Sequence, residues 1–314
     1  MNSNKTGWLF LTIVLSFIAV ELVISFTPIG DKLSIPALMV ISELSFMLPV
    51  AVCFLLSGSS LGECVALKGV KPTVAVLSIP YTWMVIPLTM ALNMATLFFT
   101  DNRASEILNT ISGGGIFLTA LFAAVAGPIC EELAFRGIIY TGIRKSGSAL
   151  QAIIISGLLF GLFHMNINQA VYAFALGVFF GAVREVTGSI IPPIICHMTV
   201  NSGGVIGMIM QKYMISDNDM LAEAARTALT PETLALGLAG DIILAFIGVA
   251  IALCLLAYMA RKQGNIRRFT DIADKRESSR GKIWGVPLIA GAALSVAFMI
   301  FLLILQYMRS GMSA

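Results

Sequence analysis

Long runs of apolar residues set the strongest limit on how this chain folds. The runs are about 18 to 26 residues long and hold few charges, the length that a helix needs to cross the ~30 Å hydrocarbon core of a bilayer. Of the 314 residues, 58% are hydrophobic and 12% are charged, whereas soluble domains carry about 25% charged residues. A transmembrane β-barrel needs alternating segments of about 10 residues, which this sequence lacks. We therefore predict an all-α, polytopic transmembrane helical bundle with about eight or nine spans.

The apolar segments divide the chain into three parts. The first segment is longer than the apolar region of a signal peptide and no small-residue cleavage site follows it, so we expect a retained span. Residues 1–113 hold the N-terminal spans, 114–211 the polar motifs described below, and 212–314 the C-terminal spans. The predicted spans are 8–26, 35–57, 74–99, 114–136, 148–165, 168–186, 189–211, 234–260 and 284–308.

The distribution of Lys and Arg predicts the orientation of the bundle. The loop 261–282 holds eight of these residues, and positively charged loops stay in the cytoplasm. Counting spans back from this loop places the N-terminus inside and the C-terminus outside, most simply in the plasma membrane. We expect the loop to lie near anionic lipid headgroups and not to bind nucleic acid, since it mostly lacks aromatic residues for base stacking.

The cysteines do not form a disulfide framework. Their number is odd and no C-x-x-C spacing occurs, so we expect free thiols. The five are Cys53, Cys64, Cys130, Cys196 and Cys254.

The fourth predicted span carries the first polar motif. A charge at the bilayer centre costs roughly 2.5–3.5 kcal/mol, so ionisable residues there are functional candidates. Glu132 and Arg136 are four residues apart and share a helix face, so we expect them to pair. Glu131 is rotated by about 100° from that face and has no local partner, which makes it the candidate general base. Snorkelling of both glutamates to water is the alternative reading of this motif alone.

Two later spans carry the only histidines of the chain. Phe160 and His164 are four residues apart, so the aromatic ring is expected to pack against the imidazole. His197 and Asn201 likewise share a helix face. A single histidine on an apolar helix is more often a core residue, so each motif is weak alone.

Together the motifs favour hydrolysis. A carboxylate can take a proton from water, an imidazole can hold that water or protonate the leaving amine, and N–H groups can stabilise the oxyanion. The same groups could bind a divalent metal such as Zn²⁺, although the H-E-x-x-H pattern of the zincins is absent.

The three motifs resemble the CPBP family, which comprises CAAX prenyl proteases and bacteriocin-processing (Abi-type) intramembrane peptidases. The family pattern is E-E-x-x-x-R, F-x-x-x-H and H-x-x-x-N on successive helices. This chain carries all three in that order, and the resemblance covers about residues 114–205. The stretch Thr187-Gly188-Ser189-Ile190 is also similar to the family.

The resemblance implies a role for each motif. It implies that Glu131 activates the water with help from His164, and that His197 and Asn201 stabilise the oxyanion. The residues expected to orient this site are Glu132, Arg136 and Phe160. We favour a metal-independent glutamic mechanism; in a metallopeptidase, the zinc ligands would be Glu131, His164 and His197.

Substrates implied by the resemblance are prenylated CAAX tails, bacteriocin-like peptides or tails of membrane proteins. Two other function classes remain open: a proton-coupled transporter, which predicts repeated halves with broken helices, and a catalytically silent immunity or scaffold protein. Oligomeric state is not readable from the sequence. Three further acidic residues in spans have no assigned role, namely Glu21, Glu43 and Asp241.

The predicted topology creates a conflict of depth. It places His164 near the outer end of the fifth span and His197 near the inner end of the seventh, whereas one site needs both at similar depth. We expect the fifth span to be short and the link 165–169 to enter the protein and line a water-filled cavity, where non-helical backbone is tolerated.

Overall fold

The computed structural model describes residues 3–57, 66–97, 116–210, 230–274 and 281–311, and these are helical apart from short connections. Residues 116–144 form one helical rod in five segments: α7 Ile116–Leu121, the π-helix η1 Phe122–Ala126, α8 Gly127–Glu132, the π-helix η2 Leu133–Ile139 and α9 Tyr140–Arg144. The remaining helices are α1 Ser3–Phe26, α2 Ile29–Lys32, α3 Ile35–Ser57, α5 Pro72–Leu97, α10 Ala149–Phe163, α11 Ile167–Thr187, α12 Ile191–Met210, α14 Pro231–Gln263, α15 Ile266–Ile272 and α16 Val286–Gly311.

This architecture confirms the predicted all-α membrane bundle. Each of the nine predicted segments coincides with a helix or with the 116–144 rod. Seven helices of the described ranges are long and apolar enough to cross a membrane, and α10 is apolar but shorter. The four described cysteines are free thiols, as expected, and Cys64 lies outside the described residues.

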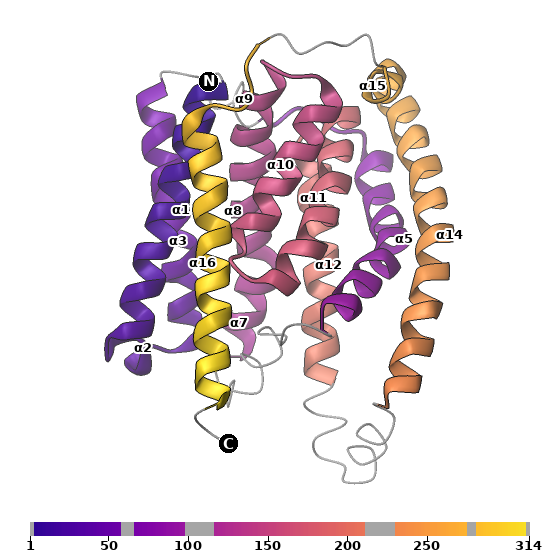
Figure 1. Ribbon diagram of the computed structural model, residues 1–314. Coiled ribbons are helices and arrows are strands. Elements are labelled where there is room, and N and C mark those ends of the chain that lie inside the picture. Colours follow the sequence, from indigo (N-terminus) through magenta and orange to yellow (C-terminus); the bar gives the residue numbers. More distant parts are fainter. Residues whose placement is uncertain (1–2, 58–65, 98–115, 211–229, 275–280, 312–314) are drawn as a thin grey trace.

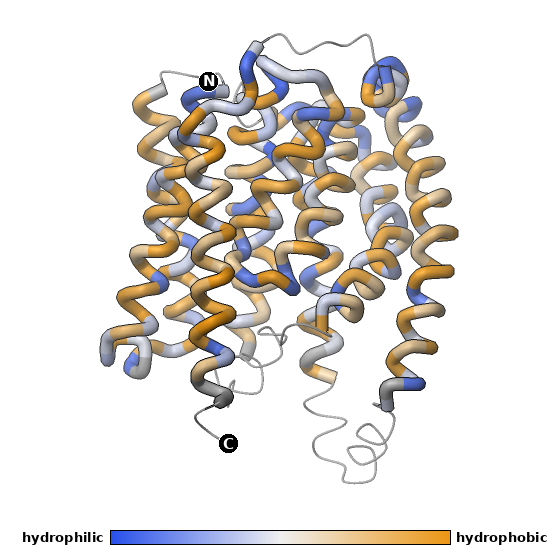
Figure 2. The backbone as a smooth tube through the Cα atoms, in the orientation of Figure 1, coloured by the Kyte–Doolittle hydropathy of each residue, from blue (hydrophilic) through white to orange (hydrophobic). Residues whose placement is uncertain are grey.

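The bundle has two outer groups of helices around a central group (Figure 1). On one side, α1 packs against both α3 and α16. On the other side, α5 packs closely against α14. The central group consists of the 116–144 rod, α10, α11 and α12. The outer helices are mostly hydrophobic, whereas hydrophilic residues recur inside the bundle around the central group (Figure 2).

Glycine allows α1 and α16 to approach closely. A Cβ atom on Gly7 would lie 3.0 Å from the backbone nitrogen of Leu288, and one on Gly291 would lie 2.8 Å from a ring carbon of Phe10. Small residues at such crossings bring helix backbones into contact, which is a main source of packing energy in lipid. The first and last described helices of the chain are therefore neighbours.

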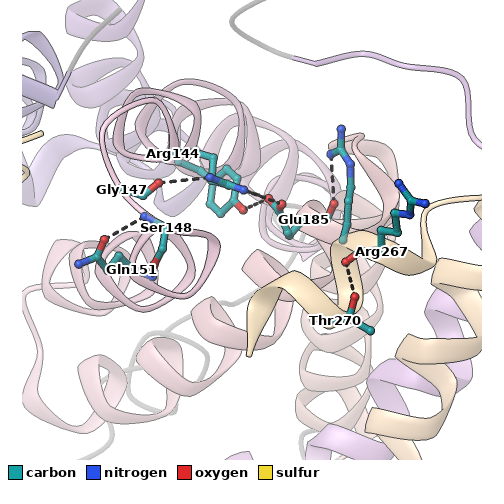
Figure 3. A network of polar contacts seen from close by, with 9 residues as sticks. Arg144, Gly147, Ser148, Gln151, Glu185, Arg267 and Thr270 are labelled. Carbon is teal, nitrogen blue, oxygen red and sulfur yellow. Dashed lines mark hydrogen bonds and ion pairs between the residues drawn. The ribbon is translucent and has the colours of Figure 1, made fainter. Parts of the chain in front are cut away.

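A polar network ties the central helices together at one end of the bundle (Figure 3). Glu185 near the end of α11 accepts hydrogen bonds from the Tyr140 hydroxyl and from Arg144, whose nitrogens lie 3.4 Å from both carboxylate oxygens. Arg268 of α15 donates to the Glu185 backbone carbonyl at 3.3 Å. The network fixes the end of the 116–144 rod against α11 and α15.

Helix α10 is short, as the depth argument required. Its 15 residues span about 22 Å at 1.5 Å per residue, less than the hydrocarbon thickness. It ends at Phe163 with His164 as its C-cap, and α11 begins at Ile167 with Asn166 as its N-cap. The Asn166 side chain accepts a hydrogen bond from the Gln169 backbone N–H. The turn lies within the length of the bundle rather than at its end (Figure 1).

Candidate active site

Glu132 joins two of the predicted motifs. One of its carboxylate oxygens lies 2.9 Å from Arg136 Nη1 and 3.0 Å from His197 Nδ1. Glu132 and Arg136 are fully buried, and the His197 side chain is 5% exposed. The pairing of Glu132 with Arg136 is thus confirmed. The contact with His197 on α12 was not foreseen, because sequence spacing carries no information on which side chains meet between helices.

Phe160 is the packing centre of this cluster. Its ring lies 4.2 Å below the Arg136 guanidinium carbon. The same ring contacts both imidazoles, with centroid distances of 4.9 Å to His164 and 5.6 Å to His197. Because one ring touches both histidines, His164 and His197 lie at similar depth. The short α10 removes the conflict that regular spans would have produced.

Hydrogen bonding assigns the tautomer of His164. Its Nδ1 lies 2.9 Å from the Phe160 backbone carbonyl oxygen, which can only accept, so Nδ1 carries the proton. In the neutral ring, Nε2 is then an acceptor. The Nδ1 atom of His197 likewise carries a proton, because it faces the Glu132 carboxylate.

Of the adjacent acidic residues Glu131 and Glu132, Glu131 has the more exposed side chain. Its carboxylate oxygen lies 3.8 Å from His197 Nε2, and its side chain is 16% exposed. Within the described structure that oxygen has no hydrogen-bond partner. Glu131 is therefore near His197 but free to bind another group, whereas no direct contact with His164 is present among the described interactions.

Asn201 contacts backbone that a π-helix has released. In η1 the N–H of Gly127 bonds to the Phe122 carbonyl five residues earlier, and such wide turns leave carbonyls without their α-helical partners. The Asn201 amide nitrogen donates to the Ala123 carbonyl at 2.8 Å. An amide has two N–H donors, so one remains for another acceptor.

The second π-helix has a similar contact. Arg184 Nε donates to the Arg136 carbonyl within η2 at 3.2 Å. Both π-segments flank the Glu131–Glu132 turn, and π-turns often occur at functional sites. The apolar sequence of this span gave no sign of them.

Glu43 is a residue near the site that sequence reasoning left without a role. Its side chain lies over Gly127 of α8, with Oε1 3.0 Å from where a Cβ atom would stand. Gly127 and Glu131 are four residues apart on α8, so the Glu43 carboxyl group lies over the helix face that also carries Glu131. The signal in the sequence was an acidic residue in an apolar span, but nothing in the sequence indicated its neighbour. Glu21 and Asp241, the other two such residues, lie on α1 and α14.

The same site residues are the candidate ligands of a divalent metal ion. Among the described residues, no three His, Cys, Asp or Glu side chains are grouped so as to hold one. One nitrogen of each histidine is already engaged by a protein oxygen.

Comparison with known proteins gave two matches. Residues 113–203 match the family model described as type II CAAX prenyl endopeptidase Rce1-like. A segment of 112 residues is 30% identical to YdiL of Bacillus subtilis (strain 168), which is provisionally named a membrane peptidase; this covers 34% of the present chain and 45% of YdiL. The chain thus spans less than half the length of this curated relative. No solved structure matches it.

Proposed function

We propose, from the membership of residues 113–203 in the CPBP family, that this membrane protein is an intramembrane endopeptidase with Glu131 as its water-activating base. The observation that carries the proposal is the convergence of Glu131, Glu132 and Arg136 with both histidines around Phe160. The helices α10 and α12 and the 116–144 rod supply these side chains, so only the folded bundle forms the site.

In the proposed reaction, water adds to the scissile carbonyl carbon. Glu131 takes one proton from the water as its oxygen bonds to that carbon. The acceptor nitrogen Nε2 of His164 orients the water by accepting its second hydrogen. When the C–N bond breaks, the proton on Glu131 passes to the leaving amine, and the products are an acid and an amine.

The oxyanion of the tetrahedral intermediate needs N–H donors. Asn201 has one amide N–H beyond the one that bonds to Ala123. His197 can donate from Nε2 only as an imidazolium, with its Nδ1 hydrogen-bonded to the Glu132 carboxylate. Glu132, Arg136 and Phe160 act by orienting these groups.

The proposal is tested by cleavage of a farnesylated CAAX peptide in proteoliposomes, with both products identified by mass spectrometry. Glu131→Gln keeps the size of the side chain but removes the base, so we expect the rate to fall by about 100-fold or more. His164→Ala should also reduce the rate strongly. Undiminished cleavage by both variants would overturn the assignment.

Substrate class and metal dependence are part of the same proposal. The peptide without its lipid, and a bacteriocin-like leader peptide, serve as alternative substrates in the assay. For a glutamic mechanism, we expect cleavage to survive extensive chelation and dialysis. Loss of activity that returns on adding Zn²⁺ would instead favour the metallopeptidase mechanism.

A further inference from the structure

A groove lies between the start of α1 and the start of α16, and the proposed reaction gives it no role. Its volume is about 450 Å³, within the range of about 300–1,000 Å³ that is usual for ligand sites. Trp8 of α1 and Val286 of α16 line it and are 57% and 81% exposed. The groove therefore opens towards the surroundings of the bundle, where the bilayer lies, and not into the active site.

The walls of this α1–α16 groove are fixed by contacts between the two helices. The Ser3 hydroxyl donates to the Lys282 backbone carbonyl at 2.7 Å, which holds the segment before α16 against the start of α1. Small residues leave the space open, since Gly285 and Ala290 both line the groove. A Cβ atom on Gly285 would lie 3.4 Å from the Asn4 side-chain oxygen. The groove is thus formed before any ligand enters.

Positive charge collects at one end of the α1–α16 groove. The exposed Lys282 lines it, and the Asn4 amide beside it adds N–H donors. Helix α16 begins here at Val286, and the positive end of a helix dipole also favours an anion. No acidic residue is among the described residues that line the groove. A ligand with a negative group therefore matches this end.

The rest of the α1–α16 groove is apolar and lies along two membrane spans. Leu11, Pro287 and Ala290 continue the lining along α1 and α16, and both helices are long and apolar enough to cross a bilayer. The Trp8 ring is amphipathic, and such rings favour the level of the lipid headgroups. A ligand that fits the whole groove combines an anionic head with a hydrocarbon chain.

We propose that the α1–α16 groove binds one anionic phospholipid, with its phosphate at Lys282 and an acyl chain along the apolar wall. Basic pockets between membrane helices recognise anionic headgroups in this way. A zwitterionic phospholipid has the same chains but brings its own positive charge to Lys282, so the groove discriminates by headgroup. The bound lipid joins the first and last described helices, and the proposal does not depend on peptidase activity.

Tryptophan fluorescence tests whether an anionic lipid occupies the α1–α16 groove. The chain has three tryptophans, and changing two of them to Phe leaves either Trp8 or Trp83 as the only one. Trp83 on α5 is a matched control, because its exposure of 59% is close to that of Trp8. Each protein is reconstituted with phosphatidylglycerol and phosphatidylcholine, one of which carries brominated chains that quench tryptophan on contact.

Quenching over a range of lipid mixtures gives the relative binding constant of the two lipids at each tryptophan. We expect phosphatidylglycerol to be favoured about fivefold or more at Trp8, and neither lipid at Trp83. An equal preference at both tryptophans would overturn the proposal, because it would show attraction to the whole protein and not to the groove.

Charge variants test the role of Lys282. One lysine near an anionic headgroup contributes about 1 kcal/mol, which is about fivefold in binding. Lys282→Gln should therefore remove most of the preference at Trp8. Lys71→Gln removes the same charge next to Gln263, at the end of α14, and should leave the preference unchanged. A preference that survives Lys282→Gln, or that falls equally in both variants, would contradict a headgroup site at Lys282.

The acyl chain is tested by filling the apolar part of the α1–α16 groove. Ala290→Leu adds bulk within the groove without changing charge, whereas Ala297→Leu makes the same change two turns further along α16, at another exposed alanine. We expect only Ala290→Leu to weaken the quenching of Trp8 by brominated phosphatidylglycerol. Equal effects would contradict a bound chain. Displacement of both brominated lipids by a farnesylated peptide would assign the groove to a prenyl chain and overturn the phospholipid proposal.

Discussion

At the scale of single residues, the buried pair of Glu132 and Arg136 bears on both the stability of the fold and the orientation of His197. Both side chains are fully buried, and removing one partner of such a pair leaves an uncompensated charge, at a cost of about 3–5 kcal/mol. We therefore expect Arg136→Met to lower the thermal unfolding temperature in detergent markedly, beyond the loss of its stacking on Phe160.

The double variant Glu132→Leu with Arg136→Met separates stability from chemistry. Replacing both charges by apolar groups of similar size is often neutral for stability, so most of the unfolding temperature should return. Cleavage should not return, because His197 loses the carboxylate that holds its Nδ1. Recovery of both properties would assign the pair no role in orienting His197.

The sequence was most informative about interactions within one helix. Four-residue spacing predicted the Glu132–Arg136 pair and the contact of Phe160 with His164, and both are present. The contacts of Glu132 with His197 and of Glu43 with α8 join different helices. Such contacts depend on which helix faces meet. Apolar runs of similar composition do not show which faces these are.

At the scale of elements, the turn between α10 and α11 determines where His164 stands. Asn166 caps α11, and its side-chain oxygen accepts from the Gln169 N–H at 3.0 Å. Met165 beside it has a positive φ of 50° and is buried, a conformation that non-glycine residues adopt at some energetic expense. A loosened cap should let this turn relax and move His164.

Variants of the N-caps of α10 and α11 test this idea. Asn166→Ala and Ser148→Ala each remove an N-cap, with an expected loss of about 1 kcal/mol of stability. Ser148 caps the start of α10, at the other end from His164. We expect both variants to lose similar stability in denaturant titrations, but only Asn166→Ala to lower kcat. Equal effects on kcat would mean that activity follows global stability rather than the turn.

Most element boundaries were predicted well because hydropathy changes sharply at the membrane surface, but the fourth predicted span, 114–136, stopped short of Arg144, where the rod ends. The π-turns η1 and η2 were not predicted, since one extra residue in a helical turn leaves the apolar character of the span unchanged. Their positions matter because Asn201 and Arg184 bind carbonyls within them. The π-turns therefore help to join the 116–144 rod to α12 and α11.

At the scale of the whole molecule, the two ends of the bundle are chemically different. The start of α1 and the basic helix α15 lie at one end, whereas α2 and the end of α16 lie at the other (Figure 1). Loops rich in Lys and Arg remain in the cytoplasm. This rule predicts that the end with α15 and the Glu185 network faces the cytoplasm.

Cysteine labelling in whole cells tests the orientation. In a variant without the five native cysteines, Asp271→Cys places an exposed thiol at the α15 end and Lys32→Cys places one on α2. We expect a membrane-impermeant maleimide added outside to label only the Lys32→Cys protein, and to label Asp271→Cys only after the cells are permeabilised. The reverse pattern would place α15 outside. Helix α12 carries His197 and begins beside the Glu185 network. With α15 outside, the start of α12 would face the exterior, and a peptidase site here would meet secreted rather than cytoplasmic peptides.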